Sequence, residues 1–101
     1  MEYEKAIKDY SKAIELNPIS AEAYNNRGTA YRELKQWERA IEDYNKAIEL
    51  NPNYTEAYWN RGIAYPETGQ YDESVRDMKK AGILFLKAGR EEYAVQAFSL
   101  F

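Results

Sequence analysis

The sequence predicts an all-α protein in which antiparallel helix pairs stack into an α-solenoid of about six helices. The first observation is internal repetition at an offset of 34 residues: residues 1–20 and 35–54 share twelve identities in twenty, and residues 21–36 and 55–70 share ten in sixteen. The second is that apolar and small residues recur at spacings of three and four within the repeat, as in amphipathic helices. A period of this length is typical of stacked repeats that bury their apolar faces against neighbours.

The first predicted element is a helix over residues 1–16, the second-helix half of a repeat unit that we place at 1–20. It ends before Asn17-Pro18, and Asn51-Pro52 ends the equivalent helix one repeat later. Proline disfavours helical geometry in the residue before it and has no backbone N–H to donate. We therefore expect both helices to stop at these dipeptides.

Residues 21–54 form the complete unit, with two amphipathic helices joined at Lys35-Gln36. Because this turn is short, the two helices are expected to lie antiparallel. Gly28 lies inside the first helix, where glycine costs about 0.5–1 kcal/mol relative to alanine. We interpret Gly28, and Gly62 in the next copy, as points where a neighbouring helix brings a large ring against the backbone.

Residues 55–88 form a degenerate unit in which Ser74 replaces an alanine and Met78 replaces a tyrosine. No Asn-Pro pair ends this unit, so its second helix is expected to continue to about residue 88. At the turn between its helices, Gly69 suits a left-handed conformation and Asp72 can cap the helix that follows.

Pro66 falls inside the first helix of this degenerate unit. It removes the hydrogen bond to the carbonyl of Gly62, and proline in a helix interior typically costs about 3 kcal/mol. The sequence therefore predicts a kink or an early end of this helix.

Residues 89–101 predict a last helix, Glu91 to Phe101, that covers an open end of its own chain or is exchanged with a second chain. A second interpretation is also open. Residues of this region resemble the middle of a repeat unit that is out of step with the others, namely Gly82, Phe85, Gly89, Tyr93, Ala94 and Phe98.

On these residues the chain resembles the tetratricopeptide repeat family. The matching positions are Tyr24, Gly28, Tyr31, Ala40, Tyr44, Ala47 and Pro52 in one unit, and Tyr58, Gly62, Tyr65 and Ala81 in the next. The resemblance covers about residues 1–81. It implies a right-handed superhelix whose first helices line a concave groove, and it implies binding of peptides or partner proteins there.

Candidate groove residues lie on the first helices, on the face opposite the packed glycines: Asn25, Asn26, Thr29, Arg32, Trp59, Asn60 and Ile63. Asn26 and Asn60 occupy equivalent places, and primary amides both donate and accept, so they could hold an extended peptide backbone. The alternative is that these amides are solvated or locally bonded. Trp59 and Ile63 suggest a pocket for an apolar side chain, unless the C-terminal helix of this chain or a partner fills it.

Family members that grip the C-terminal tails of chaperones use lysine and asparagine side chains, together with further basic residues. The corresponding positions here hold Asn25, Thr29, Trp59 and Ile63, so the resemblance implies that this carboxylate clamp is absent.

Both ends of the repeat array carry apolar residues, whereas terminal repeats need polar outer faces to stay soluble. We therefore expect a homo-oligomer, unless the chain is a piece of a longer protein that supplies a preceding helix. The candidate interface residues are Tyr3, Ile7, Tyr10, Phe85, Tyr93, Phe98 and Phe101.

Arg27 and Arg61 adjoin the packing glycines, and Asp9, Asp43 and Asp77 recur at intervals of 34 residues. We interpret these as arginine–aspartate pairs between adjacent helices that fix helix register rather than form a functional site.

Composition excludes several function classes. Histidine and cysteine are absent, which removes the commonest general base, the thiol nucleophile, the usual zinc ligands and disulfides. No glycine-rich phosphate loop occurs, so we expect neither an enzyme nor a metal or cofactor site. The net charge of −3 argues against nucleic acid. The longest apolar run, residues 83–86, is too short to span a membrane, and no signal peptide opens the chain, so we expect a cytoplasmic location.

The sequence thus leaves two candidate functions. One is a protein–protein interaction module that binds a peptide or partner protein in the groove. The other is a self-assembling scaffold whose terminal helices mediate homo-oligomerisation.

Overall fold

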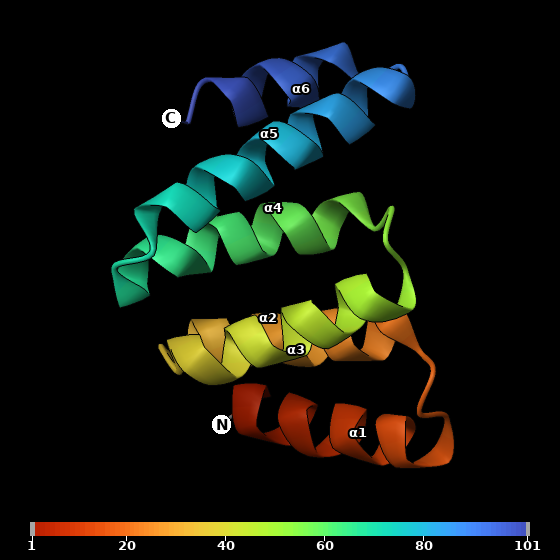
Figure 1. The fold of residues 1–101 in the computed structure, drawn as a ribbon. Helices are drawn as coiled ribbons and strands as arrows, with labels where there is room; N and C mark the ends of the chain where they lie inside the picture. The colour runs from red at the N-terminus through yellow and green to blue at the C-terminus, as the bar shows by residue number, and fades with distance from the viewer. Residues whose placement is uncertain (1, 101) are drawn as a thin grey trace.

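The computed structural model describes residues 2–100, and within that range all regular secondary structure is helical. The elements are α1 (Glu2–Leu16), α2 (Ala21–Glu33), α3 (Trp37–Leu50), α4 (Thr55–Ala64), the 3₁₀ turn η1 (Tyr65–Thr68), α5 (Tyr71–Lys87) and α6 (Glu91–Phe98). They stack in chain order, with the two ends of the chain at opposite ends of the stack (Figure 1). The prediction of an all-α solenoid with about six helices is confirmed.

Helix ends follow the local sequence rules closely. α1 and α3 end at Leu16 and Leu50, directly before the two Asn-Pro pairs, as predicted. The hydroxyl of Ser20 caps α2 by accepting a hydrogen bond from the backbone N–H of Ala23 at 3.2 Å. The expectation that Asp72 caps α5 is wrong, because α5 begins one residue earlier and places Asp72 in its first turn.

All three hairpins close with the same turn. A left-handed residue ends each first helix: Lys35 (φ 61°), Gly69 (φ 78°) and Gly89 (φ 75°). The N–H of the next residue then donates to the carbonyl five residues back: Gln36 to Tyr31 at 2.9 Å, Gln70 to Tyr65 at 3.0 Å and Arg90 to Phe85 at 2.8 Å. These backbone bonds satisfy carbonyls at the helix end. The left-handed role predicted for Gly69 is confirmed.

Close approach at glycine also recurs in each hairpin, at a spacing of sixteen residues. A Cβ on Gly28 would lie 2.9 Å from Cε1 of Tyr44, and one on Gly82 would lie 2.5 Å from Cε1 of Phe98. At Gly62 the expectation of a ring is wrong, since Cε of Met78 lies 2.9 Å from the position of a Cβ there.

Helix α5 therefore takes part in two hairpins. It packs on α4 as the second helix of one pair and on α6 as the first helix of another, which is the geometry of the out-of-step interpretation. α6 ends at Phe98, three residues before the end that we predicted.

The break in α4 confirms the expectation for Pro66. The α-helix ends at Ala64 and continues as the single 3₁₀ turn η1. Gly62 is buried, and its carbonyl accepts a hydrogen bond of 2.6 Å from the hydroxyl of Ser74 in place of one from a backbone N–H. Pro66 has no backbone N–H to donate to the buried Gly62 carbonyl. Ser74, which replaces an alanine of the other copy, supplies the missing hydrogen bond.

A double-mutant cycle tests this compensation. Ser74→Ala is expected to lower the free energy of unfolding by about 1–3 kcal/mol, because it leaves the Gly62 carbonyl unsatisfied. With Pro66→Ala, residue 66 regains a backbone donor, so Ser74→Ala should then cost less by about 1 kcal/mol. Urea denaturation of the four proteins measures the coupling, and additive effects would contradict the compensation.

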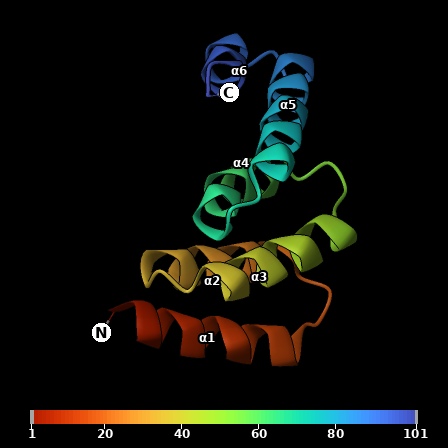
Figure 2. The ribbon, with the colours of Figure 1, turned by 60° about the vertical axis from the view of Figure 1, so that its left-hand side comes forward.

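The buried centre lies where α2 and α3 meet α4 and η1. It comprises Ala40, Ile41, Tyr44, Ala64 and Tyr65, with Tyr31 and Trp37 packed against it. Beyond this core the direction of the stack changes, and α5 and α6 turn away from the direction of α1, α2 and α3 (Figure 2). None of the helices within residues 2–100 has the length and apolar character needed to cross a bilayer.

Candidate functional site

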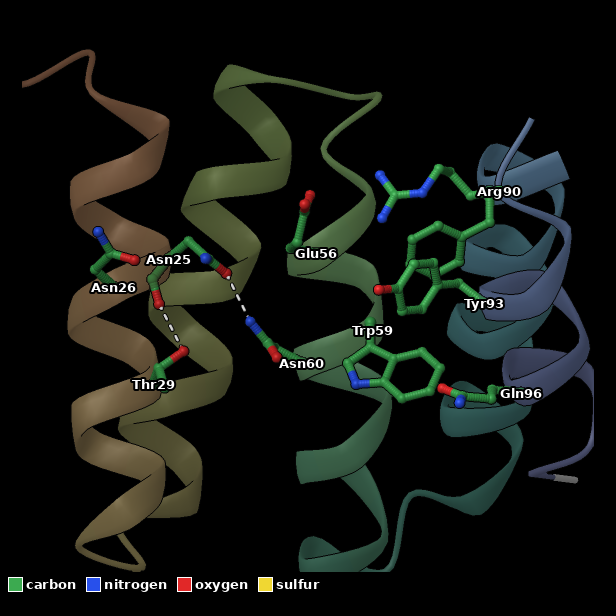
Figure 3. Close-up of a pocket in the computed structure, with 10 residues that line it drawn as sticks. Asn25, Asn26, Thr29, Glu56, Trp59, Asn60, Arg90, Tyr93 and Gln96 are labelled. Carbon is green, nitrogen blue, oxygen red and sulfur yellow. Dashed lines mark hydrogen bonds between the residues drawn. The ribbon is translucent and has the colours of Figure 1, made fainter. Parts of the chain in front are cut away.

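A groove of about 530 Å³ opens between α2, α4 and α6. Its lining residues are Asn25, Asn26 and Thr29 from α2, Glu56, Trp59 and Asn60 from α4, Phe85 from α5, and Arg90, Tyr93 and Gln96 at and within α6 (Figure 3). Five of the seven predicted groove residues therefore meet in one place. The other two, Arg32 and Ile63, line a separate depression with Trp37 and Glu67.

Asparagine side chains on one wall have unequal roles. The Nδ2 of Asn60 donates to Oδ1 of Asn25 at 3.1 Å, and its Oδ1 accepts from Nη1 of Arg32 at 3.2 Å. Asn25 is itself buried, 6% exposed. Asn26 is half-buried, and its side chain forms no hydrogen bond with any residue in 2–100.

For Asn60 the alternative of a locally bonded amide applies, while binding of a peptide backbone by Asn26 and Asn60 stays a prediction. Asn60 bridges α2 and α4, because its side chain bonds to Asn25 and Arg32 of α2. In the next repeat, Trp59 occupies the position equivalent to Asn25. Of the three groove asparagines, Asn26 is the one whose side-chain amide forms no hydrogen bond within residues 2–100, so its full bonding capacity is left for a ligand.

Thr29 connects this wall to the core. Its hydroxyl donates to the backbone carbonyl of Asn25 at 3.1 Å and lies 3.0 Å from the hydroxyl of Tyr44. Since the Thr29 proton is used on that carbonyl, the Tyr44 hydroxyl donates to Thr29. Burial raises the pKa of Tyr44, so this phenol stays a neutral donor.

The opposite wall is aromatic. The rings of Trp59 and Phe85 meet edge to face with centroids 6.3 Å apart, and those of Phe85 and Tyr93 lie 5.4 Å apart. The Arg90 guanidinium lies 4.6 Å from the Tyr93 ring centroid, within cation–π range. The alternative interpretation, that the C-terminal helix of this chain fills the pocket at Trp59, holds in part: Tyr93 of α6 packs on Phe85, which packs on Trp59, and a groove remains.

Groove electrostatics are nearly balanced. Glu56 is the one carboxylate and Arg90 the one cation among its lining residues, and the rest are amides, a hydroxyl and aromatic rings. Such a lining can hold an apolar side chain and hydrogen-bond a peptide backbone. Within residues 2–100, no three histidine, cysteine or acidic side chains gather in a way that could hold a metal ion.

Sequence reasoning did not place Arg90 and Gln96 in the groove, and it assigned Phe85 and Tyr93 to an oligomer interface. The signal for all four was the out-of-step pattern around Gly82 and Phe98, because that hairpin folds α6 back toward α4. The sequence alone does not decide between that pattern and a simple capping helix.

The expected pairing of arginine with aspartate between adjacent helices is confirmed for two of the three aspartates, and its role in fixing helix register stays a prediction. Arg27 donates to both carboxylate oxygens of Asp43 at 2.8 Å, and Arg61 does so to Asp77 at 2.7 Å. Asp9 differs, since it is exposed and forms no ion pair or hydrogen bond within residues 2–100.

The predicted oligomer residues lie at both ends of the stack. Phe98 covers Gly82, and Phe85 and Tyr93 form the groove wall, so these three have contacts within the chain. On α1, Ile7 and Tyr10 are half-buried, and the Tyr3 hydroxyl donates to Oε1 of Glu33 at 3.3 Å. Phe101 lies outside the described residues. Oligomerisation through these residues stays a prediction.

Comparison with known proteins identifies one repeat family. A family model described as "TPR repeat" matches residues 2–31 and 28–69, more than half of the chain. Among curated proteins, no match is found.

Three solved structures illustrate the fold similarity. MamA is 27% identical over 96% of this chain, with a TM-score of 0.76, and this chain spans 65% of its length. The TPR2B domain of yeast Sti1, in a complex with pHsp70, is 27% identical over 97% of this chain and 81% of that one, with a TM-score of 0.88. The first TPR domain of Spaghetti, bound to the HSP90 peptide SRMEEVD, is 30% identical over 97% of this chain and 81% of that one, with a TM-score of 0.81.

Proposed function

Because the chain belongs to the tetratricopeptide repeat family, we propose that it is a protein-interaction module that binds an extended segment of a partner protein in the groove between α2, α4 and α6. The family match and the peptide-bound structural neighbours support an interaction module in general. The observation that carries the groove proposal is the unpaired amide of Asn26 opposite the aromatic wall of Trp59, Phe85 and Tyr93.

The lining specifies the ligand chemistry. One apolar side chain would lie against Trp59 and Tyr93, where burial of its surface drives binding. The Asn26 amide would donate to and accept from the peptide backbone, which makes this contact independent of the ligand's side chains. Arg90 would favour an acidic residue near the apolar one.

This chemistry differs from that of the acidic peptide in the Spaghetti complex. SRMEEVD carries three acidic side chains and a terminal carboxylate, whereas this groove has the single cation Arg90 and the carboxylate of Glu56. We therefore expect weak binding of SRMEEVD and stronger binding of peptides with one large apolar residue and at most one acidic residue.

Peptides selected from a displayed heptapeptide library on the intact chain provide the test. Tyr93→Ala is expected to weaken a selected peptide about 30-fold, since it removes a central aromatic contact. Asn26→Ala should weaken it about two- to tenfold, through loss of one or two neutral hydrogen bonds. Fluorescence anisotropy gives the affinities, and circular dichroism checks that helicity is unchanged.

Asn53→Ala is the matched control, because Asn53 is exposed on the α3–α4 connection and outside the groove. The Asn53→Ala variant should bind each selected peptide with the same affinity as the wild type. If Asn26→Ala and Tyr93→Ala also bind every selected peptide normally, the groove is not the binding site.

A further inference from the structure

A second depression, of about 290 Å³, adjoins the groove between α2 and α4. Its lining residues are Arg32 and Glu33 from α2, Trp37 from α3, Ile63 from α4 and Glu67 from η1. The two hollows meet at one contact, because Nη1 of Arg32, which lines the depression, donates to Oδ1 of Asn60, which lines the groove, at 3.2 Å. A segment bound in the groove therefore has a neighbouring hollow beside it.

Part of the depression is apolar surface open to solvent. Ile63 is 38% exposed. Trp37 is half-buried and packs against the core. The two side chains line the same hollow, and covering their surface with an aliphatic chain would be favourable.

The charges around this apolar surface are unequal. Glu33 and Glu67 contribute two carboxylates, whereas Arg32 is the one cation among the lining residues. Arg32 is already engaged, since it donates to Asn60 and its Nε lies 3.8 Å from Oε2 of Glu33. Glu67 is exposed and forms no hydrogen bond or ion pair within residues 2–100. The depression thus combines an apolar surface with a free carboxylate.

We propose that this depression binds a lysine or arginine side chain of the same partner segment that occupies the groove, an inference that rests on the proposed function. Long basic side chains pack their stems along apolar surface while the charged head stays at a polar edge. The stem would lie against Ile63 and Trp37, and the head would meet the Glu67 carboxylate. Charge complementarity therefore favours a basic residue over an acidic or purely apolar one at this place.

Helix geometry sets the spacing of the two ligand residues. Ile63 lies four residues beyond Trp59, and Glu33 lies seven beyond Asn26. At a rise of about 1.5 Å per residue, these offsets correspond to about 6–10 Å along the helices. An extended segment that runs along α2 and α4 advances about 3.3 Å per residue. The basic residue should therefore lie about two or three positions from the apolar residue that binds at Trp59 and Tyr93.

The displayed heptapeptide library, selected on the intact chain, tests this pattern. Selected peptides that bind more weakly to Tyr93→Ala are the groove ligands. Among them, lysine or arginine is expected two or three positions from the apolar residue, on either side of it. Groove ligands without this enrichment would contradict the basic subsite and leave the proposed function standing. If Tyr93→Ala weakens no selected peptide, the proposed function fails and the subsite fails with it.

A double-mutant cycle tests the contact itself. Replacing the basic residue of a selected peptide with norleucine removes the charge and keeps an aliphatic stem. This replacement and Glu67→Gln in the protein should each weaken binding about two- to fivefold, the range for a solvent-exposed ion pair. Together they should cost no more than either alone, as expected for a directly interacting pair.

Glu42→Gln is the matched control, an equal charge change at an exposed residue of α3 outside both hollows. Fluorescence anisotropy should give the wild-type affinity for this variant. An equal loss in Glu42→Gln and Glu67→Gln would indicate a general effect of net charge and would overturn the contact with Glu67.

Reversing the charge of the depression provides an independent readout. Glu67→Lys leaves Glu33 against two cations, so a new selection on this variant should replace the lysine or arginine of the groove ligands with aspartate or glutamate at the same spacing. A loss of folding would appear in circular dichroism, whereas a reversed preference needs a folded groove. Selection of basic residues at that position by the folded Glu67→Lys variant would show that they bind elsewhere.

Discussion

Replacing Tyr44 with alanine is expected to lower the free energy of unfolding by about 3–5 kcal/mol, as for other large aromatic side chains removed from a core. Tyr44 is the largest side chain in the described chain that is fully buried, at 0% exposure. Its ring fills the space over Gly28, and its hydroxyl reaches Thr29. Because domains of this size have a total stability of about 5–15 kcal/mol, urea denaturation should show a large fall in midpoint.

Two variants separate the reasons for this loss. Tyr44→Phe keeps the ring and removes one hydrogen bond, so it should cost only about 0.5–1.5 kcal/mol. Tyr10→Ala changes the equivalent residue of α1, which is half-buried, and should cost less than half as much as Tyr44→Ala. Equal losses at Tyr10 and Tyr44 would show that the sixteen-residue glycine contact contributes little.

Features encoded by neighbouring residues were predictable from the sequence. The Asn-Pro stops, the left-handed Gly69, the break at Pro66 and the close approach of a large ring at Gly28 each depend on one repeat unit and its own hairpin. Backbone sterics decide the first three. The fourth follows from glycine inside a helix, where the missing side chain lets a neighbouring helix come close.

The candidate site depends on how different hairpins are oriented, and this was only partly predictable. Asn60 was expected to face a ligand, but it bonds to Asn25 and Arg32 across the α2–α4 interface. The groove wall needs α6 to fold back on α5, which follows from a weak pattern that competed with a simpler capping helix. Relative helix orientation comes from side-chain packing over many residues, so a single periodicity does not determine it.

The second large effect is expected at the buried pair of Arg61 and Asp77. Asp77 is 4% exposed and receives two hydrogen bonds of 2.7 Å from the guanidinium, whose third contact is Oδ1 of Asn45 at 2.8 Å. Removing one partner of such a pair leaves an uncompensated buried charge. Arg61→Met is therefore expected to cost about 3–5 kcal/mol at neutral pH.

The pH dependence of this loss has a definite sign. Burial already raises the pKa of Asp77, while the hydrogen bonds and the charge of Arg61 lower it. Arg61→Met removes the lowering contribution, so the folded-state pKa of Asp77 rises further above its unfolded value. A carboxyl with a raised folded pKa destabilises the protein above that pKa and is relieved as the pH falls through it. The stability difference between Arg61→Met and wild type should thus shrink as the pH falls from neutral toward the ordinary pKa of an aspartate.

The double variant Arg61→Met with Asp77→Leu shows whether the pair adds stability or only fixes helix register. Replacing both charges with apolar side chains of similar size is often neutral or stabilising, so we expect most of the loss to be recovered and the pH dependence to disappear. Arg76→Met, at an exposed arginine next to Asp77, is the matched control and should change stability by less than about 0.5 kcal/mol. If the double variant stays as unstable as Arg61→Met at every pH, the loss comes from the arginine stem packing on Tyr58 and Tyr65, and the buried charge of Asp77 is not its cause.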